Sequence, residues 1–213
     1  MKKQRLWLLF FLLILAFAGT MLLRAQEQAL LRPPKGAKIA LVVFEDMECP
    51  QCAHVHPLLE QAARTYRIPL VQRDFTLPYH TWSMEAALMA RYFDTKSPKL
   101  GKEFRSQVFA HQTEITKDNL RPFADKFAAE HQVELPMFVD PQGKFAAQIE
   151  ADKELGTRIG ITHTPTVYIV SSQQPRTPFV EVTDLSKLYQ MLDAARRGRL
   201  ATGATPPAFV PSR

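Results

Sequence analysis

The sequence of 213 residues contains only two cysteines, Cys49 and Cys52, separated by Pro50 and Gln51. A pair at this spacing can alternate between a dithiol and a disulfide, and its thiolates can also bind a soft metal ion. Pro50 suits the first turn of a helix, which places Cys49 at the helix start, where backbone N–H groups and the helix dipole favour a thiolate. We therefore expect Cys49 to be the nucleophile and Cys52, one turn further on, to be the resolving thiol.

Acidic residues crowd the first cysteine of this motif. Glu45, Asp46 and Glu48 precede it within four residues, and nearby negative charge opposes the formation of a thiolate. We expect Asp46 and Glu48, together with the intervening Pro50 and Gln51, to modulate the reactivity of the cysteine pair.

The flanking residues predict the elements that position the motif. Residues 38–44 form a continuous apolar run, which is typical of a strand buried on both faces. The helical pattern that opens at Pro50 continues to about Tyr66. A CxxC motif that directly follows a buried strand and opens a helix favours a redox function. Further strands are predicted at residues 69–75, 166–170 and 179–182, and a last helix at residues 184–197.

A helical segment separates the second strand from the third. Apolar side chains recur at helical spacing in three stretches, around Met89, Phe104 and Phe127. A fourth helix is expected to open at Asp140-Pro141, an N-cap followed by proline, and to end near Gly160. A parallel crossover needs only about a dozen residues, and about 90 lie here. The extra helices therefore form an insertion, at about residues 78–160.

The segment from Val42 to Tyr66 resembles the active-site segment of thioredoxin-fold oxidoreductases. Its pattern Phe44-x-Asp46-x-x-Cys49-Pro50-x-Cys52, followed by a long helical insertion, is similar to that of the DsbA-like family. The loop Gly160–Thr166 resembles the loop that carries the cis-proline of that family. The likeness thus rests on two motifs that lie more than 100 residues apart in the chain.

The resemblance implies an α/β, thioredoxin-like fold over residues 37–197, with the helical insertion between the second strand and the cis-proline strand. It implies that Pro165 is cis and lies beside the cysteines, so that Thr164 and Pro165 help to bind substrate. The implied activity is thiol:disulfide exchange with cysteine-containing proteins. A membrane or periplasmic redox partner would recycle the cysteine pair, and no cofactor or metal is expected.

The chain departs from the patterns of these relatives near the cysteines. Thioredoxins carry a buried acid six residues before the first cysteine, where this chain has Val43, and Glu48 stands in place of the usual tryptophan. The dipeptide Pro50-Gln51 matches neither the Gly-Pro of thioredoxin nor the Pro-His of DsbA. These residues leave the direction of electron flow open. An oxidising compartment favours an oxidase over a reductase.

The N-terminus predicts such a compartment. Lys2, Lys3 and Arg5 precede residues 6–23, which are uncharged and dominated by Leu and Phe. This pattern indicates either a cleaved signal peptide within residues 1–25 or an uncleaved anchor in the inner membrane, with membrane contact through residues 6–23. In both cases the positive-inside rule leaves the rest of the chain outside the cytoplasm, in the periplasm or cell envelope.

The charge of the remaining chain gives no support to nucleic-acid binding. The net charge is +6, but beyond residue 25 there are 23 Lys and Arg against 21 Asp and Glu, and no basic run is longer than Arg196-Arg197. A surface that tracks phosphates needs more concentrated positive charge. Residues 26–36 are expected to be a linker, and residues 198–213 a disordered tail.

Two other functions remain as alternatives. Cys49, Cys52, His54 and His56 supply thiolate and imidazole ligands within eight residues, which suits a copper or zinc chaperone. On a helix, however, His56 lies on the face of Cys52 while His54 points about 200° away from it. The second alternative is a non-catalytic, thioredoxin-like binding module, against which the intact CxxC argues.

Overall fold

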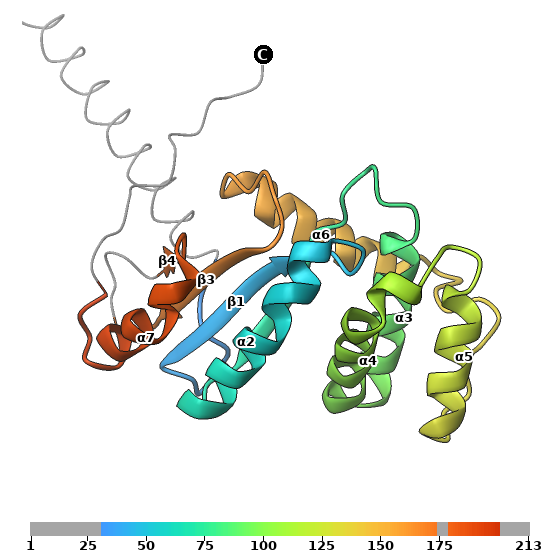
Figure 1. Ribbon diagram of the computed structural model, residues 1–213, viewed down its shortest axis with the longest axis horizontal. Helices are drawn as coiled ribbons and strands as arrows, with labels where there is room; N and C mark the ends of the chain where they lie inside the picture. The colour runs from blue at the N-terminus through green and yellow to red at the C-terminus, as the bar shows by residue number, and fades with distance from the viewer. Residues whose placement is uncertain (1–30, 174–178, 201–213) are drawn as a thin grey trace, which may run out of the picture.

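The computed structural model of the chain describes residues 31–173 and 179–200 (Figure 1). The predicted targeting segment and residues 201–213 of the predicted tail lie outside the described residues. One sheet of four strands runs through the described part, in the order β2-β1-β3-β4, with β2 parallel to β1 and the other neighbours antiparallel. The strands are β1 Ile39–Glu45, β2 Leu70–Asp74, β3 Thr166–Ser171 and β4 Phe179–Glu181.

Helices cover both faces of this sheet, which is why every residue of β1 is buried. On one face, α2 (Pro50–Tyr66) and α7 (Leu188–Arg196), which follows the short 3-10 helix η2 (Leu185–Lys187), pack against Leu41, Val43 and Ile169. On the other face, α6 (Lys144–Arg158) packs against Phe44 and Phe75. Gly156 allows this approach, because a Cβ there would lie 2.7 Å from the Phe75 ring. β1 thus forms the centre of a layered α/β core.

The helical insertion lies between β2 and β3 in the chain, which confirms the predicted fold class. Figure 1 shows its first three helices beside the sheet and α6 behind it. Phe93, Phe104 and Phe127 build its aromatic core, with the ring of Phe93 centred 4.8 Å from that of Phe104 and 5.0 Å from that of Phe127. The elements are α3 Ser83–Lys96, α4 Pro98–Ala110, the 3-10 helix η1 Gln112–Glu114 and α5 Leu120–Glu130.

The start of α6 differs from the prediction. The helix begins at Lys144, after Gly143 in a left-handed conformation with φ 67°, and not at Asp140-Pro141. Asp140 lies three residues before the N-cap but still binds the first turn of the helix. Its carboxylate accepts a hydrogen bond of 2.8 Å from the backbone N–H of Ala146. Asp140 therefore lies outside the helix, and the turn at Gly143 places the first helical residue at Lys144.

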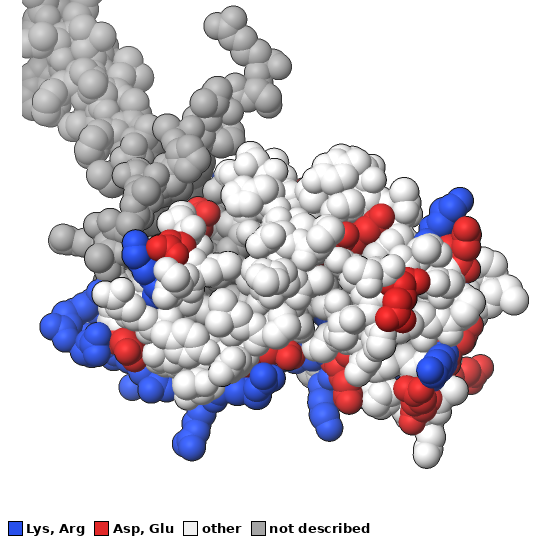
Figure 2. Space-filling view, viewed as in Figure 1, with Lys and Arg blue, Asp and Glu red and all other residues white. Residues whose placement is uncertain are grey.

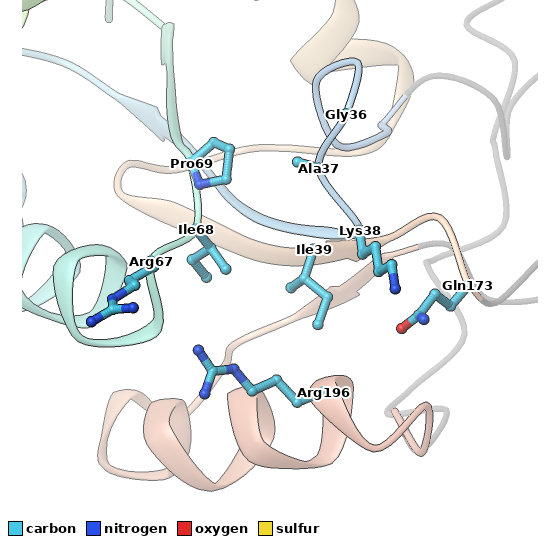
Figure 3. Close-up of a pocket in the computed structure, with 9 residues that line it drawn as sticks. All are labelled: Gly36, Ala37, Lys38, Ile39, Arg67, Ile68, Pro69, Gln173 and Arg196. Atoms are coloured by element: carbon cyan, nitrogen blue, oxygen red, sulfur yellow. The ribbon is translucent and has the colours of Figure 1, made fainter.

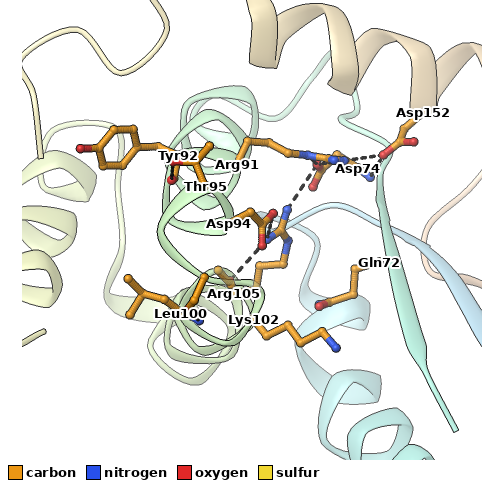
Figure 4. Close-up of polar contacts among 12 residues, drawn as sticks. Gln72, Asp74, Arg91, Tyr92, Asp94, Thr95, Leu100, Lys102, Arg105 and Asp152 are labelled. Carbon is orange, nitrogen blue, oxygen red and sulfur yellow. Dashed lines mark hydrogen bonds and ion pairs between the residues drawn. The ribbon is translucent and has the colours of Figure 1, made fainter. Parts of the chain in front are cut away.

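A cluster of buried charges joins the insertion to the sheet (Figure 4). Arg91 of α3 donates to Asp74 of β2 at 2.6 Å and also pairs with Asp152 of α6. Arg73 of β2 donates to the same Asp152 at 2.7 Å, and Arg105 of α4 lies 3.5 Å from Asp74. Both aspartates and Arg105 are at most 4% exposed. Since an unpaired buried charge is costly, this cluster fixes four elements relative to one another.

Candidate redox site

The two cysteines lie where β1 passes into α2. Cys49 is the N-cap residue of α2, and Pro50 occupies the first helical turn, as predicted. Both sulfurs are free thiols; Cys49 is 8% exposed and Cys52 1%. Pro50 and Gln51 are exposed at the surface. Cys49 is therefore the more accessible thiol, and Cys52 is buried and packs against the apolar core of the insertion.

The surroundings of the two thiols shift their pKa values in opposite directions. The pKa of Cys49 falls from 9.0 to about 5, chiefly because the Cys52 side chain donates a hydrogen bond to it. Burial opposes this shift, whereas Thr164 and the backbone N–H groups of Cys52 and Gln51 add to it. The pKa of Cys52 is raised far above its usual value, first by burial and then by its hydrogen bond to Cys49 and the charge of Glu45. At neutral pH the site therefore holds a Cys49 thiolate and a Cys52 thiol.

The loop predicted to carry the cis-proline meets Cys49. The peptide bond between Thr164 and Pro165 is cis, and the carbonyl oxygen of Thr164 lies 3.5 Å from Cys49 Sγ. Phe44 at the end of β1 pairs with Thr166 at the start of β3. The loop that follows β1 and the loop that precedes β3 therefore lie at the same end of the sheet. The structure thus places Thr164 and Pro165 beside the cysteine pair.

The two acids nearest Cys49 accept hydrogen bonds from backbone N–H groups. The Asp46 carboxylate accepts hydrogen bonds from the backbone N–H groups of Glu48, at 2.8 Å, and Leu77, at 2.7 Å. The Glu48 carboxylate accepts from the N–H groups of Trp82, at 2.7 Å, and Ser83, at 3.0 Å. Both side chains were expected to modulate the thiol, and the structure gives them contacts that hold the loop before Cys49 in place.

Two further residues that support this loop were missed by the sequence analysis. Gln112 of η1 donates from Nε2 to the carbonyl oxygens of Met47, at 2.8 Å, and Cys49, at 3.0 Å. His80 lies with Nδ1 2.8 Å from a carboxylate oxygen of Asp46, and its side chain is 12% exposed. A single glutamine or histidine outside any motif gives no sequence signal for such a contact.

The four side chains considered under the metal-chaperone alternative do not converge. His54 is exposed on α2, whereas His56 is buried and directed at Glu45 and Ser106. Within the residues that the structure describes, no group of three or more His, Cys, Asp or Glu side chains is arranged to hold a metal ion. The geometry therefore gives no support to the metal-chaperone alternative.

A surface pocket of about 350 Å³ lies at the opposite end of β1 and α2 from the cysteines (Figure 3). Lys38, Arg67 and Arg196 line it, and the guanidinium of Arg196 stacks over the Tyr66 ring at 4.5 Å. Figure 2 shows Lys and Arg gathered along this lower edge of the molecule, while the upper edge, where α2 begins, is largely uncharged. On this face, the end of the molecule where α2 begins is thus the less charged one.

Comparisons with known proteins agree with this architecture. Among solved structures, alpha-DsbA1 of Wolbachia pipientis is similar with a TM-score of 0.63 and 18% sequence identity, over 82% of this chain and 98% of that chain. BdbD of Bacillus subtilis is similar with a TM-score of 0.60 and 17% identity, over 79% of this chain and 91% of that chain. DsbA2 of Pseudomonas aeruginosa is similar with a TM-score of 0.56 and 18% identity, over 76% of this chain and 91% of that chain.

At the level of sequence, no protein with a curated description matches this chain. A family model described as thioredoxin matches residues 34–177, a span that holds the cysteine pair, the insertion and the cis-proline. That span is more than half of the chain. The chain therefore belongs to the thioredoxin family, and its fold is the DsbA-like variant with a helical insertion.

Proposed function

We propose that the protein is a thiol:disulfide oxidoreductase that exchanges a Cys49–Cys52 disulfide with cysteines of proteins outside the cytoplasm. The observation that carries the proposal is the unequal state of the two thiols: the pKa of Cys49 is lowered to about 5, and that of the buried Cys52 is raised. Disulfide exchange needs such a pair, because one sulfur must attack or leave as a thiolate and the other must lie close enough to form a disulfide bond with it.

The difference between the pKa values of the two thiols also favours the oxidase direction. A stabilised Cys49 thiolate stabilises the reduced form of the protein, which makes its disulfide a stronger oxidant. A substrate thiolate attacks Cys49 Sγ, the Cys49–Cys52 bond breaks, and Cys52 leaves and takes up a proton. A second substrate thiolate then attacks the substrate sulfur of the mixed disulfide and releases the Cys49 thiolate. Two electrons pass from the substrate to the protein, and the low pKa of Cys49 makes it the better leaving group.

Residues beside the cysteines suit the binding of a substrate segment. Thr164 is 9% exposed, its carbonyl oxygen lies 3.5 Å from Cys49 Sγ, and Pro165 next to it has no N–H that would need a partner. We assign Thr164 and Pro165 to substrate binding. Pro50 and Gln51, which are exposed between the cysteines, are assigned to tuning the reduction potential.

The proposed site of action is the periplasm or cell envelope, where a redox partner recycles the cysteine pair. This assignment rests on the uncharged residues 6–23 behind three basic residues. In the described segments, no helix is sufficiently long and apolar for a membrane span. Residues 6–23 are outside those segments, and the anchor is part of the proposal.

The proposal is tested by the reduction potential of the full-length chain, equilibrated with mixtures of reduced and oxidised glutathione. We expect a potential closer to about −120 mV, the value of DsbA, than to about −270 mV, the value of thioredoxin. A reduction potential near that of thioredoxin would instead indicate the reductase direction. Two thiols that do not respond to glutathione would overturn the redox function itself.

A further inference from the structure

Three cations from different segments line the surface pocket at the opposite end of β1 and α2 from the cysteines, which we call the basic pocket (Figure 3). Lys38 directly precedes β1, Arg67 is the C-cap residue of α2, and Arg196 is the last residue of α7. All three residues are exposed. Among the described residues that line the pocket there is no Asp or Glu. The described lining therefore carries positive charge without a compensating acid.

The three cations of the basic pocket also lack acidic partners in the rest of the described chain. None of them forms an ion pair with a described Asp or Glu, whereas Arg64 on α2 pairs with Glu60 at 3.3 Å. Asp193 is the acid nearest to Arg196 in the sequence, and its carboxylate accepts a hydrogen bond of 2.8 Å from the Tyr66 hydroxyl. Cations that line one hollow repel one another, and an anion bound among them would be attracted to each.

Arg67 occupies a backbone conformation in which glycine is the usual residue. Its φ is 51° and its ψ is 47°, which is the left-handed region and is unfavourable for a residue with a Cβ atom. The turn itself uses backbone groups, because the N–H groups of Arg67 and Ile68 donate to the carbonyl oxygens of Arg64, at 3.2 Å, and Ala63, at 3.0 Å. A glycine could make the same bonds, so the closure of α2 does not explain the arginine side chain. Strained residues of this kind cluster at ligand-binding sites.

The side chain of Arg196 is ordered before any ligand binds. Its guanidinium stacks over the Tyr66 ring at 4.5 Å and donates to the Tyr66 carbonyl oxygen at the end of α2. Within the described part of the chain, this is the one hydrogen bond that the Arg196 side chain makes. A guanidinium has five N–H donors, so most of them remain available to a ligand. An ordered side chain lowers the entropic cost of binding.

The basic pocket combines this cationic rim with apolar residues. Figure 3 shows Ile39 and Ile68 between Arg67 on one side and Lys38 with Gln173 on the other. The volume of about 350 Å³ is at the lower end of the range for small-molecule sites, about 300–1,000 Å³. A bare inorganic anion would leave much of this space and both isoleucines without contact. An anion that carries a small organic group suits both parts of the lining.

We propose that the basic pocket binds a phosphate ester, with the phosphate oxygens accepting hydrogen bonds from the cationic rim and the organic group over Ile39 and Ile68. Phosphate fits better than carboxylate, because it carries more negative charge and offers three acceptor oxygens to the forked donors of arginine. Two sources share this chemistry: a soluble phosphate ester and the head group of an anionic phospholipid. Only residues 24–37 separate the proposed anchor from Lys38, which would keep a membrane surface close to the pocket. This inference is independent of the proposed redox function.

The soluble source is tested by calorimetric titration of the full-length chain, in a non-ionic detergent, with glycerol 3-phosphate. Binding should weaken as the salt concentration rises. Arg67→Gln and Lys38→Gln should each lower the affinity about tenfold, the loss expected when a hydrogen bond to a charged group is removed. The matched control is Arg64→Gln, which removes the same charge from the same helix but lies outside the pocket lining. Its affinity should stay within about twofold of the wild type, because salt screens a charge that does not touch the ligand.

The lipid source is tested with the full-length chain in nanodiscs of phosphatidylcholine, with and without phosphatidylglycerol. The readout is exchange of the Ile68 amide hydrogen, whose bond to the Ala63 carbonyl oxygen closes α2 at the pocket. Phosphatidylglycerol should slow this exchange in the wild type and in Arg64→Gln. In Arg67→Gln the lipid should have no effect.

Binding that the pocket variants lose and the control keeps supports the proposal, and the assay that detects it identifies the source. A wild-type chain that responds to neither ligand would overturn the proposal. Equal losses in Arg64→Gln and Arg67→Gln would also overturn it, since they would indicate diffuse attraction to a charged surface. Arg67→Gly separates binding from folding: its midpoint of urea unfolding should stay near that of the wild type while binding is lost. A large fall in the stability of this variant would instead give the arginine a structural role.

Discussion

The Glu48 carboxylate lies 2.7 Å from the backbone nitrogen of Trp82, so the residue before Cys49 caps a helix of the insertion. This contact and the bonds from Gln112 to the carbonyl oxygens of Met47 and Cys49 tie the redox loop to the insertion on two sides. The insertion thus supports the cysteines as well as covering them.

Replacing Glu48 by Ala should destabilise the protein by about 0.5–2 kcal/mol, the usual cost of losing a helix cap. The N–H groups of Trp82 and Ser83 lose their acceptor, so their amide hydrogens should exchange faster than in the wild type. Glu48→Gln, which keeps an acceptor oxygen, should recover much of the loss. Equal exchange rates in all three proteins would contradict the capping role.

The two thiols should behave differently when removed one at a time. Cys52→Ser leaves the attacking thiol in place and blocks resolution, so this variant should accumulate mixed disulfides with substrate proteins. Cys49→Ser should accumulate few and should lose activity in oxidative refolding. Non-reducing gels of trapped complexes provide the measurement. The reverse pattern would exchange the roles of the two residues.

Removing Cys52 should also change the chemistry of its partner. The hydrogen bond from Cys52 is the largest cause of the lowered pKa of Cys49, which stands at about 5. Cys52→Ala should therefore raise the pKa of Cys49 towards its ordinary value. The rate of alkylation by iodoacetamide, followed against pH, reports this pKa. An unchanged alkylation profile would show that the helix start alone stabilises the thiolate.

The stability of the reduced protein should depend on pH through Cys49. Its pKa is lowered on folding from 9.0 to about 5, so between these values the unfolded chain binds more protons than the folded chain. The free energy of unfolding should rise with pH across this window, and the contribution should disappear as pH falls through about 5. Denaturant titrations of reduced wild type and reduced Cys49→Ser measure the difference. Parallel curves for the two proteins would argue against a native thiolate.

The buried ion cluster should matter far more for stability than ion pairs at the surface. Arg91→Met removes the cation that Asp74 and Asp152 share, although Arg105 and Arg73 stay beside them. The loss should be up to about 3–5 kcal/mol. Lys126→Met removes an exposed pair with Glu130, at 4.0 Å, and should cost at most about 1 kcal/mol. Urea unfolding of the two variants compares them directly. Similar losses would mean that the cluster is not the main link between the insertion and the sheet.

Local patterns predicted the elements of this fold well. The apolar run before Cys49 gave a buried strand, and Pro50 marked the helix start, because burial and helix entry leave a signal within a few adjacent residues. The contacts of Glu48 and Gln112 could not be predicted in this way. They join side chains to backbone groups 34 to 65 residues away, and such bonds impose no periodicity on the sequence. His56 shows the same limit: its position on α2 was predictable, but its partner on α4 was not.

The pairing of Phe44 with Thr166 has a consequence for how a newly made chain acquires reactivity. Thr164, which touches Cys49 Sγ, lies 115 residues further along the chain. At about 5–20 residues per second, roughly 6–23 s of synthesis separate the two residues. During that interval Cys49 lacks its contact with the Thr164 carbonyl oxygen. The CxxC motif is thus synthesised well before the cis-proline loop that completes its surroundings.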